Sequence, residues 1–168
     1  YYLGLADPAK QEPVVAGLTY DLASVSKVVG VGTVLAFLVQ QGQIDIDRPL
    51  ASYYPDMEQT EVTIRQLLTH TSGLDPFIPR RDDLDAEGLK EALHRLKEQV
   101  LAPWQMKETT FGPVSQAVPT LRGVPAGVVH DPKARVLGVH AGSAGLFSTI
   151  KDMEIFLEHY LQDPFSEI

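Results

Sequence analysis

One stretch of the chain is apolar on every side, and this pattern predicts a helix inside the protein. Residues 22–39, LASVSKVVGVGTVLAFLV, begin with two serines and a lysine and continue almost without polar residues. Apolar residues around the whole circumference of a helix indicate burial on all faces, unlike the single apolar face of a surface helix. Glycine commonly ends helices. We therefore expect a central helix that ends near Gly42.

The remaining segments follow other patterns. In TIRQLLTHTSGL, residues 63–74, Thr63 and Gln66 have the spacing of a capping box, which predicts the start of a short helix. Gly73 is expected to end this helix. Residues 103–149 contain many prolines and glycines and predict short strands joined by irregular loops. Two further segments combine the helical period with charges on one face, which predicts amphipathic helices: residues 85–101 and 148–162.

Composition narrows the class of protein. A chain of 168 residues is long enough for one domain with its own core. The net charge of −8 argues against nucleic acid or an anionic membrane as the main partner, and the absence of cysteine excludes thiolate catalysis. The longest apolar run, residues 28–39, has about 12 residues against the roughly 18 that span a bilayer. We expect no transmembrane segment, and no signal-peptide pattern is visible in YYLGLADPAK.

The central helix begins with a serine and a lysine whose spacing suits nucleophilic catalysis. Ser24 and Lys27 are three residues apart, an advance of about 300° and 4.5 Å, which brings both side chains to one face within hydrogen-bonding reach. A neutral lysine could take the serine proton, and nearby backbone N–H groups could hold an oxyanion. Burying an unpaired ammonium is costly, so Lys27 needs a reason to lead this helix. We predict that Lys27 is mostly buried, with its Nζ within hydrogen-bond reach of Ser24 Oγ. On chemistry alone, a catalytic and a structural interpretation both stay open.

The same spacing occurs a second time, at Ser148 and Lys151. There a helix-capping serine and a solvated lysine on an amphipathic helix explain the two residues without catalysis. Ser26 points about 160° away from the face of Ser24 on a helix. We therefore predict that Ser24, and not Ser26 or Ser148, is the nucleophile.

Other chemistry has weaker support in the sequence. The five histidines form no H-E-x-x-H motif, and no G-x-S-x-G motif is present. His70 in THTSG is interpreted as a structural residue at a helix end. Gly30 and Gly32 lack the third glycine of a dinucleotide-binding loop, since position 35 is leucine. We expect neither a metal nor an organic cofactor.

Five segments together resemble the serine β-lactamase and penicillin-binding-protein superfamily, in particular its class C-related branch with D-Ala-D-Ala peptidases and esterases. They occur in the family's order: YDLASVSK, GQIDIDRPL, VTIRQLLTHTSGL, LAPWQMKETTF and VHDPKARVLGVHAGSAGLFSTIKDMEIF. The resemblance implies an α+β, β-lactamase-like fold over residues 1–168, in which helices and a helical subdomain flank an antiparallel sheet. It also implies that Ser24 is acylated, that Lys27 accepts its proton, and that the Ser24 N–H contributes to an oxyanion hole.

The predicted function is that of a serine hydrolase that acylates and deacylates Ser24. The expected substrates are β-lactams, D-Ala-D-Ala peptides or small esters, and the family resemblance suggests the cell envelope as the location. The alternative is a catalytically inactive binding protein with the same fold. It follows from two departures: a chain without asparagine cannot contain the family's Y-x-N motif, and no K-T-G motif follows GLFST.

These departures also predict that the chain is incomplete. GLKEALHRL resembles the helix before the family's tyrosine motif, and EQVLAPWQM resembles the end of the helix after it. We therefore expect a missing segment near residues 96–99, together with missing terminal strands. Loss of that segment would remove one wall of the Ser24 site and expose apolar surface of the central helix.

Overall fold

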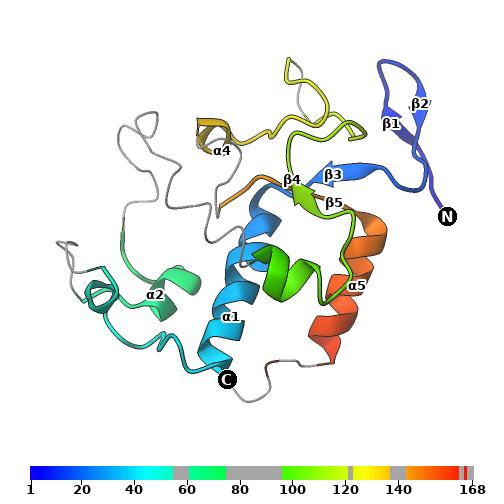
Figure 1. The fold of residues 1–168 in the computed structure, drawn as a ribbon. Coiled ribbons are helices and arrows are strands. Elements are labelled where there is room, and N and C mark those ends of the chain that lie inside the picture. The colour runs from blue at the N-terminus through cyan, green and yellow to red at the C-terminus, as the bar shows by residue number, and fades with distance from the viewer. Residues whose placement is uncertain (55–60, 75–95, 121–122, 137–142, 163–164, 166–168) are drawn as a thin grey trace.

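A computed structural model describes residues 1–54, 61–74, 96–120, 123–136, 143–162 and 165. Figure 1 shows the order and arrangement of the helices and strands. In this order they are β1 (Leu5–Asp7), β2 (Glu12–Pro13), β3 (Thr19–Asp21), the 3₁₀ turn η1 (Ala23–Val25), the π-helical η2 (Lys27–Gly32), α1 (Thr33–Gln40), the 3₁₀ turn η3 (Leu50–Ser52), α2 (Ile64–Leu68), the π-helical η5 (Lys97–Leu101), β4 (Thr110–Phe111), α4 (Pro132–Val136), β5 (Leu146–Thr149) and α5 (Ile150–Leu161).

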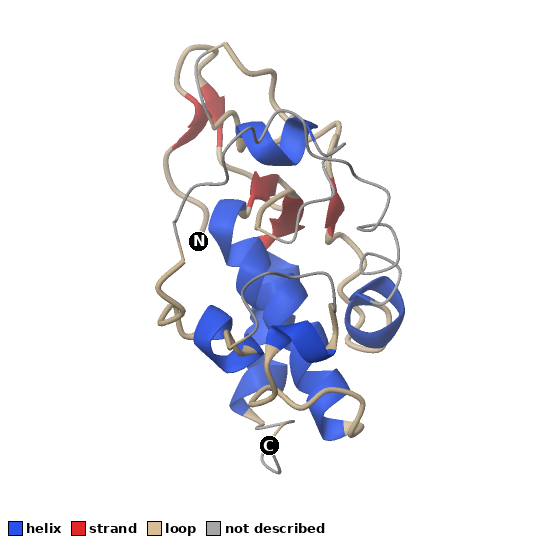
Figure 2. Cartoon of the chain, turned by 90° about the vertical axis from the view of Figure 1, so that its left-hand side faces the viewer, coloured by secondary structure: helices blue, strands red, loops and turns tan. Residues whose placement is uncertain are grey.

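The strands form two antiparallel sheets. β1 pairs with β2 in a hairpin, and the second sheet has the order β3-β5-β4. In that sheet Asp21 of β3 and Thr110 of β4 both lie opposite Phe147 in the central strand. Figures 1 and 2 show α1 and α5 on one side of this sheet and α4 on the other. The predicted α+β fold, an antiparallel sheet flanked by helices, is confirmed.

The long helix is continuous from Ala23 to Gln40 but is not α-helical throughout. Its first turns are 3₁₀ and π, and Thr33 Oγ1 donates to the carbonyl oxygen of Val28, five residues earlier, at 2.9 Å. The helix ends as predicted at Gly42, which has a φ of 68°. Glycine takes this left-handed conformation without the strain that a Cβ atom would cause.

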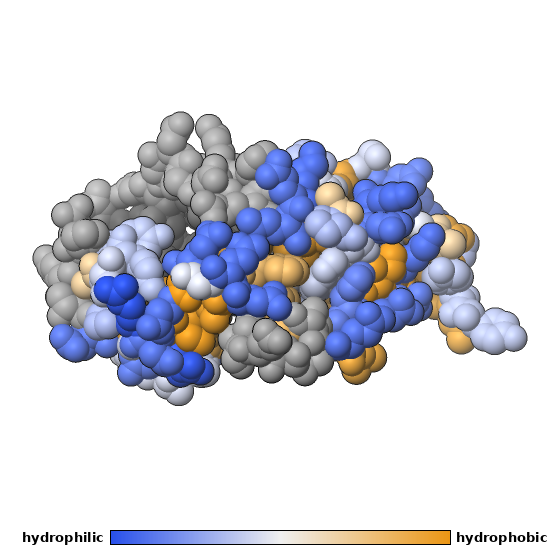
Figure 3. Space-filling model, turned by 60° about the horizontal axis from the view of Figure 1, so that its bottom comes forward, coloured by the Kyte–Doolittle hydropathy of each residue, from blue (hydrophilic) through white to orange (hydrophobic). Residues whose placement is uncertain are grey.

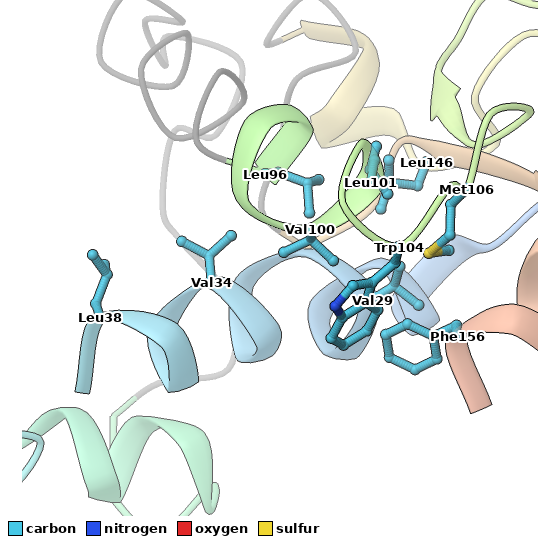
Figure 4. Close-up of a cluster of buried hydrophobic side chains, with 10 residues drawn as sticks. All are labelled: Val29, Val34, Leu38, Leu96, Val100, Leu101, Trp104, Met106, Leu146 and Phe156. Carbon is cyan, nitrogen blue, oxygen red and sulfur yellow. The ribbon is translucent and has the colours of Figure 1, made fainter. Parts of the chain in front are cut away.

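The main core lies between this helix, η5 and α5. Figure 4 shows Leu96, just before η5, and Val100 of η5 directed toward the long helix, and Trp104 beside Val29 and Phe156. Val29 and Val100 are completely buried. The buried members of this cluster are Val29, Val34, Leu38, Leu96, Val100, Leu101, Trp104, Met106, Leu146 and Phe156.

One face of the long helix is exposed, so the prediction that it is buried on all sides is wrong. Val25, Val28 and Val31 are 47%, 52% and 39% exposed, and their spacing of three places them along one side of the helix. We call these three residues the valine stripe. Figure 3 shows hydrophobic areas among the hydrophilic surface on one face of the molecule.

The helix is also longer than the apolar run in the sequence. Residues Ala23–Gln40 have a mean hydropathy of 1.6 over 18 residues, which by length and composition is enough to cross a membrane. The core helix of a soluble protein passes the same test. Here the helix packs its Val29 side into the main core.

Local capping determines where the shorter helices begin and end. The predicted capping box is present: Thr63 Oγ1 accepts from Gln66 N at 3.1 Å, and Gln66 Oε1 accepts from Thr63 N at 2.9 Å. The helix ends before Gly73, because His70 takes the left-handed conformation with a φ of 58°. α5 begins with Thr149 as its cap. Most of the helix predicted at residues 85–101 lies outside the described residues.

Candidate active site

Ser24 lies on a sharp turn between β3 and the long helix. The turn follows Asp21, and the Leu22 N–H donates to the carbonyl oxygen of Leu146 in β5 at 2.9 Å. Ala23 has a φ of 45°, which is unusual for a residue with a side chain. Ser24 itself is exposed. The sheet and the turn thus present a serine hydroxyl at the surface, at the beginning of a helix.

The predicted contact between the serine and the lysine is present. Lys27 Nζ lies 2.9 Å from Ser24 Oγ and donates a second hydrogen bond of 2.9 Å to the carbonyl oxygen of Ser143. Lys27 is half-buried, whereas the sequence predicted that it is mostly buried. Its exposure follows from its position in the first helical turn, next to the exposed Val28. Two fixed contacts hold the amine beside the hydroxyl.

The other candidate serines have structural roles. Ser26 is 3% exposed, and its Oγ accepts from Leu146 N at 3.2 Å. Ser148 is buried in β5, where its Oγ lies 2.8 Å from Thr109 Oγ1. Ser148 does not cap α5 as one interpretation of the sequence had it, since Thr149 does so. Neither buried hydroxyl is available to a substrate in the conformation described.

The carboxylate of Asp21 joins the serine turn to a distant loop. One oxygen accepts from Ala23 N at 2.8 Å, and the other accepts from His130 N at 2.7 Å. Sequence analysis missed Asp21, although aspartate often bonds the backbone N–H two residues further on. It also missed Ser143, because a contact through a backbone carbonyl leaves no signature in the residue type.

Tyrosines are not part of this arrangement in the portion of the chain that the structure describes. Tyr160 Oη lies 3.0 Å from Thr33 Oγ1, and Tyr53 Oη donates to the carbonyl oxygen of Asp45 at 3.0 Å. Neither contacts Ser24 or Lys27. Across the described ranges, no group of three or more histidine, aspartate or glutamate side chains could hold a metal ion. At Ser24 and Lys27 the structure brings a hydroxyl beside an amine.

A cavity of about 470 Å³ lies elsewhere, against η5 and β4. Its lining includes Lys97, Met106 and Phe111 but neither Ser24 nor Lys27. This cavity therefore does not include the candidate nucleophile.

Comparison with known sequences identifies the family. The sequence model of the beta-lactamase family matches residues 1–97 and 88–166. A beta-lactamase of Providencia stuartii is 30% identical over 82 residues, which cover 47% of this chain and 21% of that protein. The esterase EstB of Burkholderia gladioli is 38% identical over 78 residues, which cover 42% of this chain and 20% of EstB. The chain thus spans about a fifth of the length of these relatives.

Solved structures share the fold at low sequence identity. A class C beta-lactamase from Rhodobacter sphaeroides superposes with a TM-score of 0.65 and 20% identity over 94% of this chain and 56% of that one. D-amino acid amidase from Ochrobactrum anthropi superposes with a TM-score of 0.70 and 19% identity, over 95% of this chain and 61% of the amidase. FmtA from Staphylococcus aureus superposes with a TM-score of 0.72 and 15% identity, over 95% of this chain and 57% of FmtA. With the family match across most of its length, the chain belongs to the beta-lactamase family.

Proposed function

We propose that the protein is a serine hydrolase in which Ser24 is acylated and Lys27 accepts its proton. The observation that carries this proposal is the 2.9 Å contact between Lys27 Nζ and Ser24 Oγ at an exposed turn. When the lysine is neutral, the serine hydroxyl can donate in the same contact. The carbonyl oxygen of Ser143 holds the amine by a second hydrogen bond and so keeps its lone pair directed at the hydroxyl.

The reaction follows from these contacts. Ser24 Oγ attacks the carbonyl carbon of the substrate while its proton moves to Lys27 Nζ, and a tetrahedral oxyanion forms. The Ser24 N–H, at the start of the helix, is the proposed donor to that oxyanion. When the carbon–nitrogen or carbon–oxygen bond breaks, the leaving group takes the proton from Lys27. Water then hydrolyses the ester on Ser24 and restores the free enzyme.

The proposed substrates are β-lactams, D-Ala-D-Ala peptides and small esters or amides. All of them carry an electrophilic carbonyl, and the similar sequences include a beta-lactamase and an esterase, while one structure of similar fold is an amidase. A peptide from peptidoglycan would place the protein in the cell envelope. No step in this scheme requires a cofactor.

Intact-mass spectrometry tests the proposal. The protein is incubated with benzylpenicillin and, separately, with a fluorophosphonate, and the modified residue is located by peptide mapping. We expect one adduct, on Ser24, which is absent from Ser24→Ala and retained in Ser115→Ala, a change of another exposed serine. Labelling at another residue, or equal labelling of Ser24→Ala, would contradict the assignment.

A second candidate function is that of an inactive binding protein. The absence of asparagine favours it, because the family's Y-x-N motif cannot be present in this chain. Such a protein would bind benzylpenicillin or a D-Ala-D-Ala peptide reversibly, with heat released in calorimetry and no increase in mass. The same samples therefore distinguish the two functions.

We further propose that a segment of the family is absent near residues 96–99. The two family matches overlap at residues 88–97, next to that position. Within the part of the chain that the structure describes, Gln99 Oε1 is buried without a hydrogen-bond partner, and the valine stripe is exposed on the long helix. A missing helical segment would account for both the unpaired oxygen and the exposed valines.

The natural protein tests this directly. Its intact mass, measured after isolation from the source, should exceed 18.4 kDa by an inserted segment. A proteolytic peptide from that source in which residues 93–101 are joined as in this sequence would contradict the proposal, and the inactive binding protein would then become the better interpretation.

A further inference from the structure

The turn that carries Ser24 depends on an unusual backbone conformation. Ala23 has a φ of 45°, a left-handed conformation that strains a residue with a Cβ atom. This angle determines the direction of the next peptide unit, which carries the Ser24 N–H. If Ala23 relaxed to a negative φ, both the N–H and the hydroxyl of Ser24 would move relative to Lys27.

Asp21 holds this conformation from two sides. Its first oxygen accepts from Ala23 N at 2.8 Å. This hydrogen bond fixes the orientation of the peptide plane between Leu22 and Ala23, from which the φ of Ala23 is measured. Its second oxygen accepts from His130 N at 2.7 Å. A carboxylate can accept both bonds at once, whereas an asparagine side chain has one acceptor and one donor.

The far end of this connection is rigid. Val129, next to His130, is completely buried in a second core cluster with Phe147, Ala134 and Ala144. Phe147 in turn lies opposite Asp21 in the sheet. The carboxylate therefore spans two backbone segments that are each packed against the same strand.

We propose that Asp21 is a positioning residue, whose carboxylate holds the Ala23 turn against the His130 loop and so keeps Ser24 aligned with Lys27. The inference rests on the proposed function, since it assumes that Ser24 is acylated. The Asp21 carboxylate bonds the backbone N–H groups of Ala23 and His130, and we assign it no contact with the reacting atoms. Its effect should therefore fall on the rate of the chemical step and not on substrate binding.

Acylation kinetics of the full chain test this role. The acylation rate constant at saturating benzylpenicillin and the half-saturating concentration of benzylpenicillin are measured for the wild type and for Asp21→Asn, below the unfolding temperature of both. We expect the rate constant to fall about tenfold, because small misplacements of a reacting group are costly, with the half-saturating concentration unchanged. An unchanged rate constant, or a change in the half-saturating concentration alone, would overturn the inference.

A matched control and a rescue separate positioning from general loss of structure. Asp45→Asn is the control, because Asp45 also accepts a backbone N–H two residues on, from Asp47 at 3.0 Å, but in another loop. It should acylate at the wild-type rate. When Ala23→Gly is added to Asp21→Asn, the acylation rate constant should rise about threefold above that of Asp21→Asn alone. Glycine adopts a positive φ without the strain. No rescue by glycine would count against positioning.

Amide exchange gives a readout that does not depend on acylation. In the wild type the N–H groups of Ala23 and His130 should exchange slowly, and both should exchange faster in Asp21→Asn but not in Asp45→Asn. If the wild type is not acylated at all, the proposed function fails, and the positioning role fails with it. If the wild type is acylated and Asp21→Asn reacts equally fast, only the positioning role fails.

Discussion

Ser26 Oγ accepts a hydrogen bond from the backbone N–H of Leu146 at 3.2 Å, and both groups are buried. The serine two positions after the candidate nucleophile thus anchors the helix to β5. Ser26→Ala would leave the Leu146 N–H without this partner inside the protein. We expect the free energy of unfolding to fall by about 1–3 kcal/mol, measured by urea denaturation.

The same variant should still be acylated on Ser24, because in the described structure the Ser26 hydroxyl bonds Leu146 N, whereas the Lys27 amine bonds Ser24 and Ser143. Ser115→Ala, which removes an exposed hydroxyl, should unfold within error of the wild type. A loss of labelling in a folded Ser26→Ala protein would disagree with a purely structural role.

Replacement of Lys27 tests the proton acceptor. Lys27→Met keeps most of the side-chain volume but removes the amine that contacts Ser24 and Ser143. We expect the acylation rate to decrease by about 10²–10⁴-fold, the usual contribution of a positioned base. Lys151→Met is the matched control, since Lys151 belongs to the second serine–lysine pair and is exposed. Equal rates for Lys27→Met and the wild type would exclude Lys27 as the base.

Gly127 should be among the least replaceable residues of the chain. It has a φ of 81°, and a Cβ atom built there would lie 1.8 Å from the carbonyl oxygen of Val114. Gly127→Ala should lower the free energy of unfolding by about 2 kcal/mol or more, through strain and a backbone clash together.

Gly123 separates these two effects. Its φ of 82° is nearly the same, but no atom lies within 4 Å of its Cβ position. Gly123→Ala should therefore cost only the strain, about 1 kcal/mol, in the same urea titration. If Gly127→Ala and Gly123→Ala lowered the free energy of unfolding equally, the backbone around Val114 would have moved to accommodate the new methyl group without cost.

One exposed ion pair predicts a pH dependence of stability. The Arg65 guanidinium, which donates from Nη2 to Asp47 Oδ2 at 2.9 Å, holds the pKa of the Asp47 carboxyl below its ordinary value of 3.8. The pKa of Asp47 is lower in the folded than in the unfolded protein, so ionised Asp47 stabilises the fold. This stabilisation is complete at a pH above the unfolded-state pKa and is lost as the pH falls through the folded-state pKa. Asp47→Asn and Arg65→Gln should both reduce the slope of the unfolding free energy against pH on the acid side.

The measurement is the free energy of unfolding from about pH 6 to about pH 3. Arg48→Gln serves as the control, because it removes a neighbouring exposed arginine without breaking the pair. High salt should reduce the difference between the wild type and Asp47→Asn, since exposed charges are screened. Identical slopes for all variants would show that the pair does not contribute.

The elements that the sequence predicted correctly depend on neighbouring residues. The capping box of Thr63 and Gln66, the end of the long helix at Gly42 and the short distance between Ser24 and Lys27 all follow from spacings of a few positions. Such spacings are visible in one sequence because helix geometry fixes them. The family resemblance added the sheet, which spacing alone did not define.

The features that were missed depend on residues far apart in the chain. Asp21 and His130 are 109 positions apart, and Lys27 and Ser143 are 116 apart. The left-handed His70, which ends α2 before the expected Gly73, could not be predicted because only a few per cent of non-glycine residues take this conformation. The exposed valine stripe was not predicted from the apolar pattern, because a pattern does not reveal which elements are present to cover it.

The attachment of the serine turn to Leu146 has a consequence for when the site can form. Leu146 receives a hydrogen bond on its carbonyl oxygen from Leu22 N, and its own N–H donates to Ser26. During synthesis, Ser24 therefore leaves the ribosome long before the strand that holds its turn in place. The nascent chain should stay unreactive until residue 146 has emerged and long-range strand pairing is complete, a slow step in folding. Reactivity toward a fluorophosphonate would then report the completion of folding.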